Sequence, residues 1–382
     1  MRREIFSDEH EHFRAEVRRF AQAEIVPHLD DWNQSGQCDR DIWRKMGSAG
    51  FLGANAPEEY GGGGVDFLFD AVVMEELAYH RAHTPQVSVH ADICMPYLAS
   101  YGSEAQKEKF LTGAITGECV LAIAMTEPGT GSDLANVQTR AIRDGDEYVI
   151  NGAKTFISNG QSCDLVIVVA KTDPEASPPH RGISLILVEA SAPGFERGRN
   201  LAKLGLKGQD TSELFFKDCR VPVENVLGAE GRGFKMLMEK LQQERLCIGV
   251  GSIASCRRSL DDTLDYVKNR KAFGQPIGQF QNTQFKLAEL ASQVEIGQAF
   301  VDKLLAAHVR GEEIVSEVSM AKWWTTDLQR RLSAECLQLF GGYGFMSEYP
   351  ISQDYADAAV QSIYAGTNEI MKVIIARKLG LG

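Results

Sequence analysis

The sequence contains no apolar run that approaches the roughly 20 residues of a membrane-spanning helix. It also lacks an excess of positive charge, because 40 Lys and Arg face 52 Asp and Glu and give a formal net charge of −12. A negative chain argues against nucleic acid as a partner. With 44% hydrophobic and 24% charged residues, the composition is that of an ordinary globular protein, and 382 residues suggest two or three domains.

The cysteines and histidines are not spaced as metal ligands. The eight cysteines include no C-x-x-C pair, and only His180 and His308 of the eight histidines lie outside the N-terminal region. We therefore expect reduced, buried thiols, with no metal site and no disulfide framework. Metal-assisted chemistry and attack by a His-paired nucleophile are both poor candidates.

Several nucleotide-binding and hydrolase motifs are also absent. No strand runs into G-x-G-x-x-G, no G-x-x-x-x-G-K-[ST] occurs, and there is no G-x-S-x-G elbow. The glycine run Gly61–Gly64 follows no predicted strand, so it indicates a turn rather than a phosphate loop. A carboxylate base combined with an organic cofactor remains open.

The periodicity of apolar residues predicts an α+β fold in three domains. An N-terminal α-helical domain, 1–118, has helices at 7–25, 41–49, 65–82 and 96–111. A middle all-β, barrel-like domain, 119–226, has strands at 120–125, 147–150, 154–157, 165–170, 183–188 and 212–216, with a hairpin turn at Asn151-Gly152. A C-terminal helical bundle, 227–382, has helices at 233–256, 258–271, 281–309, 313–340 and 367–379.

Glu244 shares one predicted helical face with Leu237, Leu241 and Ile248. Burial disfavours the charged carboxylate, so the pKa of Glu244 should rise from about 4.3 toward neutrality, where a general base works well. The alternative is a partly exposed glutamate paired with Lys240 one turn earlier.

Three polar, glycine-rich loops interrupt regular structure, as a cofactor with phosphates and a ring would require. They are Met125–Ser132, Leu339–Phe345 and Ile363–Glu369. The last reaches a helix that Thr367 should cap, and the free N–H groups of such an N-terminus favour anions. Each segment could also be a plain loop.

Five motifs in combination make the chain resemble the acyl-CoA dehydrogenase family of flavoproteins over essentially its whole length. They are Ala124–Asp133 (A-M-T-E-P-G-T-G-S-D), Phe156–Gly160 (F-I-S-N-G), Arg270–Gly274 with Gln281, Gln338–Phe345 and Tyr364–Thr367 (Y-A-G-T). The resemblance implies FAD between the β domain and the bundle. The cofactor-binding residues it implies are Ile123, Ala124, Met125, Thr126, Gly131, Ser132, Phe156, Ile157, Ser158, Arg270, Phe273, Gln281, Gln338, Gly341, Gly342, Thr367, Asn368 and Glu369.

The same resemblance implies a homotetramer, a dimer of dimers, in which Arg270, Gln281, Gln338 and Gly342 come from a neighbouring subunit. The acyl-CoA substrate would contact Ser132, Gln242, Gln243, Arg245, Ala365 and Gly366. Electron-transferring flavoprotein is the implied electron acceptor.

The position after Tyr364 distinguishes branches of the family. Many members carry the catalytic Glu there, but this chain has Ala365, which cannot abstract a proton. In the isovaleryl-CoA and long-chain branches the base lies on the helix after the β domain, in a segment that Leu241–Leu246 resembles. Glu244 would therefore remove the α-proton while the β-hydrogen passes as hydride to flavin N5, giving a trans-2-enoyl-CoA in fatty-acid β-oxidation.

Other functions remain open. An isovaleryl-CoA or branched short-chain dehydrogenase and an oxygen-using acyl-CoA oxidase share the implied fold, and a non-catalytic relative could bind FAD or CoA as an interaction protein. The N-terminus, Met1–Phe6, shows neither a signal-peptide core nor a long Arg/Ser-rich presequence. We expect a cytoplasmic, bacterial protein, with a processed form from the mitochondrial matrix as the alternative.

Overall fold

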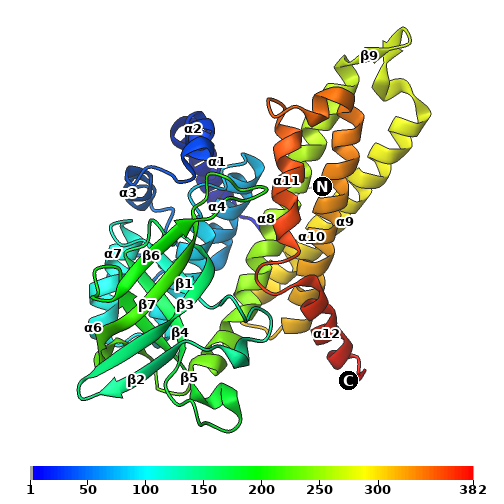
Figure 1. The fold of residues 1–382 in the computed structure, drawn as a ribbon. Helices are drawn as coiled ribbons and strands as arrows, with labels where there is room; N and C mark the ends of the chain where they lie inside the picture. The colour runs from blue at the N-terminus through cyan, green and yellow to red at the C-terminus, as the bar shows by residue number, and fades with distance from the viewer. Residues whose placement is uncertain (1–2, 382) are drawn as a thin grey trace.

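The computed structural model describes residues 3–381, and it consists of N-terminal helices, a β-sheet and a long helical bundle (Figure 1). The predicted order of α, β and α regions is confirmed. We retain 1–118, 119–226 and 227–382 as proposed domain boundaries. No helix among residues 3–381 is both long and apolar enough to cross a bilayer.

The N-terminal region is built from short helices around a shared apolar core. Ser7 caps the first helix in a capping box with His10. The predicted helix 96–111 is broken after Tyr101, where Gly102 is extended and Ser103 caps a new helix. The helices are α1 (Asp8–Phe20), α2 (Leu29–Ser35), α3 (Asp41–Ser48), α4 (Phe67–Tyr79), the π-helix η4 (Val89–Cys94), α5 (Met95–Tyr101), α6 (Glu104–Gln106), the π-helix η5 (Lys107–Leu111) and α7 (Thr112–Ile115).

The middle region is one eight-stranded mixed sheet in the order β6-β7-β3-β2-β4-β5-β8, with β1 pairing with β4 in parallel. Inward-facing residues from most strands, such as Ile150, Val168 and Leu214, meet in one cluster, so the sheet curves around its own core. The strands are β1 (Leu121–Ala124), β2 (Arg140–Asp144), β3 (Glu147–Ser158), β4 (Leu165–Lys171), β5 (Ile183–Glu189), β6 (Phe195–Asn200), β7 (Thr211–Pro222) and β8 (Val226–Leu227).

The predicted hairpin at Asn151-Gly152 is wrong. β3 runs through both residues, and the hairpin turn lies earlier, between Asp144 and Glu147, where β2 pairs with β3. A register shift between Ile150 and Gly152 marks a bulge in the pairing with β7. A Cβ on Gly152 would lie 2.4 Å from Thr139 Oγ1, so the glycine permits a close strand approach rather than a turn.

The C-terminal region is a bundle of long helices: α8 (Gly233–Asn269), α9 (Gln281–Val309), α10 (Val315–Phe340), α11 (Pro350–Gln361) and α12 (Asn368–Lys378). The predicted break near residue 257 is wrong, because α8 is continuous. Arg257 and Arg258 there are half-buried and pair with Glu295 and Asp262, so their charges are satisfied without interrupting the helix. Helix α11 was not predicted, while Thr367 caps α12 as predicted.

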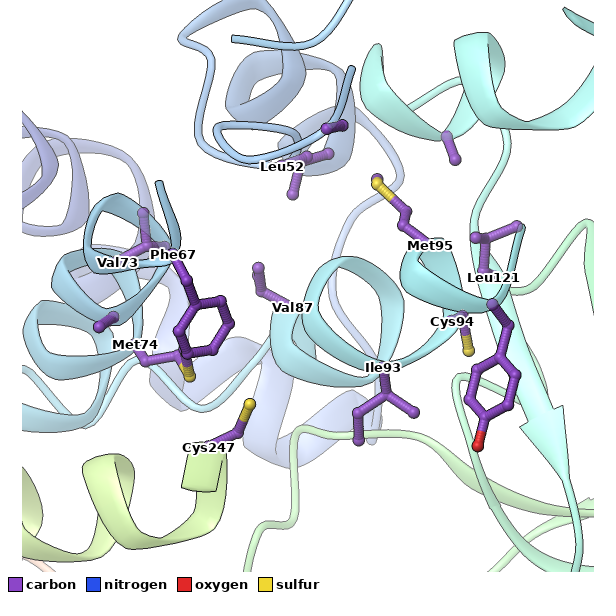
Figure 2. Packing of buried hydrophobic residues seen from close by; sticks show 14 of the residues in the cluster. Leu52, Phe67, Val73, Met74, Val87, Ile93, Cys94, Met95, Leu121 and Cys247 are labelled. Atoms are coloured by element: carbon purple, nitrogen blue, oxygen red, sulfur yellow. The ribbon is translucent and has the colours of Figure 1, made fainter. Parts of the chain in front are cut away.

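Helix α8 connects the three regions, because it packs on α4, α9 and α10 and runs past the sheet (Figure 1). The strands β9 (Lys271–Ala272) and β10 (Gln275–Pro276) form a hairpin at its far end. Figure 2 shows Phe67 and Met74 of α4, with Ile93 of η4, near Cys247 of α8. Met74, Ile93 and Cys247 also line the cavity of the candidate site, and Phe67 packs in the same apolar cluster.

Candidate active site

One cavity of about 220 Å³ lies where α4, η4, the sheet, α8 and the loop before α12 meet. The wall that the N-terminal helical region contributes is apolar and includes Val73, Met74 and Leu77 of α4 and Ile93 of η4. Its other walls bring together predicted site residues that are far apart in the sequence: Ile123, Met125, Thr126, Phe156, Ile157, Ser158, Glu244 and Ala365.

Glu244 contributes a carboxyl group to this cavity although the residue is only 4% exposed. Burial raises the pKa of Glu244 to about 7, against the opposing effects of a Tyr97 hydrogen bond, Arg245 and Lys240. The alternative of an exposed pair with Lys240 is wrong, because Lys240 Nζ donates to Ser100 Oγ at 2.6 Å. The predicted burial of Glu244 is confirmed.

Tyr97 is the partner of Glu244 that sequence reasoning missed. Its hydroxyl donates to Glu244 Oε1 at 2.8 Å, and its side chain is fully buried. Burial, with Glu244 nearby, raises the pKa of Tyr97 well above its usual value, so it remains a phenol that donates a hydrogen bond. Nothing in the apolar pattern around α5 distinguishes Tyr97 from a core aromatic residue.

The loop after β1 is held on the cavity by a buried ion pair. Lys154 Nζ, fully buried, donates to the Met125 carbonyl at 3.0 Å and to Glu127 Oε1 at 2.9 Å. Glu127 also accepts hydrogen bonds from the backbone N–H groups of Gln138 and Thr139. The segment that carries Met125 and Thr126 is therefore fixed to β3, which carries Phe156 and Ser158.

Two residues of the same predicted loop lie outside the cavity. Gly131 and Ser132 are exposed, and a Cβ on Gly131 would meet no atom within 4 Å. Ala124 points into the core of the sheet instead. Phe156, by contrast, has a left-handed backbone with φ of 60° and is 67% exposed, which presents its ring toward open space.

The loop before α12 forms the opposite boundary of the site. Ala365 has a φ of 51° and Gly366 a φ of 86°, so two successive residues are left-handed. Asn368 is buried and bonds with Lys322 and Thr326, whereas Glu369 is exposed in the first turn of α12. Thr367 caps the helix through Ile370 N–H.

The predicted FAD-tail residues Arg270, Gln338, Gly341 and Gly342 line a separate shallow recess. Arg270 follows the last residue of α8 and lies 26 residues after Glu244. At a rise of 1.5 Å per residue, the two residues are about 39 Å apart along the helix axis. Gln281 and Phe273 are exposed near the same end. One chain therefore does not bring these residues to its own cavity, and their contact with FAD from a neighbouring subunit stays a prediction.

Of the six predicted substrate residues only Ala365 lines the cavity, and Ser132, Gly366, Gln242, Gln243 and Arg245 do not. Gln242 accepts from the Ile314 N–H at 2.7 Å and donates to the Glu312 carbonyl, toward the α9–α10 connection. Gln243 donates to the Asp92 carbonyl at 2.7 Å. Arg245 is buried, and its Nε has no hydrogen-bond partner among residues 3–381. Their contact with substrate stays a prediction that the geometry does not support.

The residues present fit a flavin dinucleotide. The cavity combines an apolar wall with the polar side chains of Thr126 and Ser158. The loop that continues from Thr126 carries Gly129 and Gly131, where added Cβ atoms would meet no atom within 4 Å. Phe156 offers an exposed ring at the cavity, and the capped N-terminus of α12 begins beside Ala365. An aromatic ring system could thus lie beside the apolar wall.

Three family models match in succession along the chain. They are described as the N-terminal, middle and C-terminal domains of acyl-CoA dehydrogenase, and they match residues 7–118, 122–219 and 231–380. The chain belongs to the acyl-CoA dehydrogenase family. Members of this family are FAD flavoproteins and oxidoreductases of fatty-acid metabolism, typically tetrameric, so the chain is an FAD-dependent enzyme of that class.

Individual relatives agree with the family model. The chain is 50% identical to the long-chain specific acyl-CoA dehydrogenase of mouse mitochondria, covering 99% of this chain and 88% of the relative. Isovaleryl-CoA dehydrogenase of Pongo abelii is 35% identical to this chain, and the match covers 97% of this chain and 88% of the relative. A solved acyl-CoA dehydrogenase from Geobacillus kaustophilus superposes with a TM-score of 0.97 at 52% identity over 98% of each chain.

Two further solved structures bear on the electron acceptor. A structure described as an electron transferring flavoprotein of Acidaminococcus fermentans has a TM-score of 0.93 and 34% identity over 98% of each chain. The prolyl acyl carrier protein oxidase AnaB has a TM-score of 0.91 and 30% identity over 98% and 100% of the chains. The fold alone therefore does not separate a dehydrogenase from an oxidase.

Proposed function

We propose that this enzyme removes two hydrogens from the α and β carbons of a long-chain acyl-CoA thioester and forms trans-2-enoyl-CoA, in fatty-acid β-oxidation. The observation that carries the proposal is the buried carboxyl group of Glu244, whose pKa is about 7 and which faces the same cavity as Ala365. A base with a pKa of about 7 is about half carboxylate at neutral pH, so both the basic form and a driving force for proton transfer are available.

The chain's own groups have separate tasks in this reaction. Glu244 takes the α-proton, and Tyr97 orients its carboxylate through the bond to Oε1. The free N–H of Ala365 donates to the thioester carbonyl, which stabilises the charge that develops there. The apolar wall excludes water and holds the acyl chain. FAD, when bound along Met125–Thr126 and Phe156–Ser158, supplies the acceptor for the β-hydride.

The preference for a long, unbranched chain rests on two observations. The cavity wall formed by Val73, Met74, Leu77, Val87 and Ile93 is aliphatic, so it suits an acyl chain without polar groups. The long-chain specific relative is also more similar to this chain than the isovaleryl-CoA relative, at 50% against 35% identity. A branched short-chain substrate is the second candidate.

We further propose electron-transferring flavoprotein as the acceptor, with oxygen as the alternative that the similarity to AnaB keeps open. The assembly we propose is a homotetramer. Mitochondrial and bacterial relatives both occur, so a cytoplasmic bacterial location remains our proposal, with the mitochondrial matrix second.

The function is tested by anaerobic mixing of the purified yellow protein with a series of acyl-CoAs from butyryl- to stearoyl-CoA and with isovaleryl-CoA. We expect palmitoyl-CoA to bleach the flavin fastest and the product to be the trans-2-enoyl thioester by mass spectrometry and ultraviolet absorbance. Fastest bleaching by isovaleryl-CoA would move the enzyme to the branched-chain group. No bleaching by any thioester would reject the proposed reaction, and oxygen uptake without an added acceptor would indicate an oxidase.

A further inference from the structure

Lys322 on α10 is a fully buried lysine that the mechanism above does not use. Its ammonium group donates to the Gly366 carbonyl at 2.8 Å and to Asn368 Oδ1 at 3.1 Å. The pKa of Lys322 is lowered to about 8, mainly by burial and to a lesser extent by Arg245 on α8, while Glu369 on α12 opposes both effects. The group is therefore mostly charged at pH 7, although it makes no ion pair among residues 3–381.

The backbone that Lys322 contacts is the left-handed pair Ala365–Gly366. A left-handed alanine is strained relative to glycine, so neighbouring contacts must hold it in place. The Ala365 N–H has no acceptor among residues 3–381, and Ala365 lines the cavity that contains Glu244. A strained residue with an unused donor at the reaction cavity is the arrangement of a preorganised hydrogen-bond site.

We propose that Lys322 is a positioning residue for the reaction: it holds the Gly366 carbonyl so that the Ala365 N–H faces the thioester oxygen of the substrate. This inference rests on the proposed dehydrogenation, and it adds a residue from α10 that does not itself touch substrate. Lys322 acts on the loop through the Gly366 carbonyl. Asn368 is a second anchor for the Lys322 ammonium group, because the Oδ1 of Asn368 accepts hydrogen bonds both from Lys322 and from Thr326 Oγ1, the latter at 3.1 Å.

A purely structural role makes a different prediction. Burying a cation without a carboxylate partner is unfavourable, so an apolar side chain of similar shape is often neutral or stabilising at such a position. If Lys322 served only packing, Lys322→Met would leave the reaction unchanged and the protein equally or more stable. If it positions Ala365, the same variant slows the reaction without a loss of stability.

The test compares the rate of anaerobic flavin reduction by palmitoyl-CoA in the wild type, Lys322→Met and a control, Lys372→Met. Lys372 is an exposed lysine on α12 that lies over the ring of Trp323 at 5.0 Å, so its replacement removes a nearby ammonium from the surface. We expect Lys322→Met to slow reduction by about 10- to 100-fold with little change in substrate affinity, since misplacing one donor has this effect. The control should reduce at the wild-type rate.

A second readout does not depend on activity. Amide hydrogen exchange over 361–371 should become faster in Lys322→Met, while the strands β4 and β5 keep their protection. Lys322→Gln, a shorter donor without charge, should fall between the wild type and Lys322→Met in both readouts, and it serves as the variant of choice if Lys322→Met does not fold.

The outcomes separate this inference from the proposed function. Equal reduction rates and equal local exchange in the wild type and Lys322→Met overturn the positioning role while leaving the dehydrogenation intact. A wild type that no acyl-CoA reduces rejects the dehydrogenation itself. If Lys372→Met slows flavin reduction as much as Lys322→Met does, the loss of any nearby positive charge has the same effect. That result would also overturn the specific role of Lys322.

Discussion

At Glu244 two opposing effects set the charge of the carboxyl group. Burial raises the pKa to about 7, and the hydroxyl of Tyr97 lowers it by donating to the carboxylate. The active form of a base is the carboxylate, so the rate of flavin reduction should rise with pH through about 7 and fall below it. The pH dependence of single-turnover reduction measures this midpoint directly.

Removing the Tyr97 hydroxyl should raise the pKa of Glu244 further, because the carboxylate loses its donor. We predict that Tyr97→Phe moves the midpoint of the pH profile to higher pH by about one unit, as the loss of a charged hydrogen bond implies. Tyr101→Phe is the matched control, because the Tyr101 hydroxyl donates at 2.6 Å to Glu239, an exposed carboxylate on α8, the helix that also carries Glu244. A profile that stays in place or moves to lower pH contradicts the assignment of Tyr97.

The buried carboxyl group also makes stability depend on pH. Its folded-state pKa is raised, so the protonated form favours folding below the unfolded pKa of about 4.5, and this contribution is lost as pH rises through about 7. Glu244→Gln cannot ionise, so above pH 8 it should be more stable than the wild type by up to about 3 kcal/mol. Chemical denaturation at pH 5 and pH 8.5 tests this, and an advantage that is equal at both pH values would contradict it.

At the scale of elements, the join between the loop after β1 and strand β3 depends on the pair Lys154–Glu127. We predict that Lys154→Met lowers stability by about 3 to 5 kcal/mol, because it leaves a buried carboxylate without its partner. The double variant Lys154→Met/Glu127→Gln should recover much of the stability yet release FAD faster than the wild type. Thermal unfolding and flavin release measure the two effects. If the double variant retains FAD as tightly as the wild type, the pair does not hold the cofactor loop.

Strand β3 offers a test of the corrected topology. Gly152→Ala should destabilise the protein by about 1 to 3 kcal/mol, because the new Cβ would lie 2.4 Å from Oγ1 of Thr139, the residue that precedes the neighbouring strand β2. Gly145→Ala is the control, since its added Cβ would meet nothing and only the left-handed turn at φ of 64° is strained. A Gly152→Ala variant no less stable than the control would contradict the close approach.

The same elements show what the sequence could predict. Strong periodicity identified the three regions and the burial of Leu237 and Glu244 on α8. The predicted face is only partly confirmed, because Leu241 and Ile248 are half-buried while the consecutive residues 244–247 are all buried. The Asn151-Gly152 hairpin was wrong because a bulge uses the same residues as a turn. The break in α8 was wrong because Arg257 and Arg258 are half-buried and paired with Glu295 and Asp262, so their charges do not interrupt the helix. Tyr97 and Lys322 were missed because their roles depend on residues 147 and 44 positions away, and no local pattern records such contacts.

At the scale of the whole molecule, one chain leaves large aromatic side chains uncovered at the far end of α8. Phe273 is 96% exposed and Phe345 is 83% exposed, close to the recess that contains Arg270 and Gln338. Such side chains favour burial against another subunit. This supports the proposed tetramer and the contribution of that end to a neighbour's FAD.

The assembly makes a separate prediction. Phe273→Asp should weaken tetramer formation by about 10- to 100-fold, since it removes the burial of one large apolar side chain per contact. It should also loosen FAD, although the cavity around Glu244 is untouched. Sedimentation velocity and flavin content measure both effects, with the surface variant Lys303→Asp on α9 as a control for added charge. A tetramer that retains its affinity and its FAD would exclude this end as the contact.

The most direct measurement is the rate of flavin reduction by palmitoyl-CoA in Glu244→Gln, with Glu239→Gln, an exposed glutamate on the same helix, as the control. The account predicts that Glu244→Gln binds FAD and palmitoyl-CoA like the wild type and is reduced at least about 1,000-fold more slowly, whereas Glu239→Gln is reduced normally. Reduction of Glu244→Gln at the wild-type rate would show that another group removes the proton.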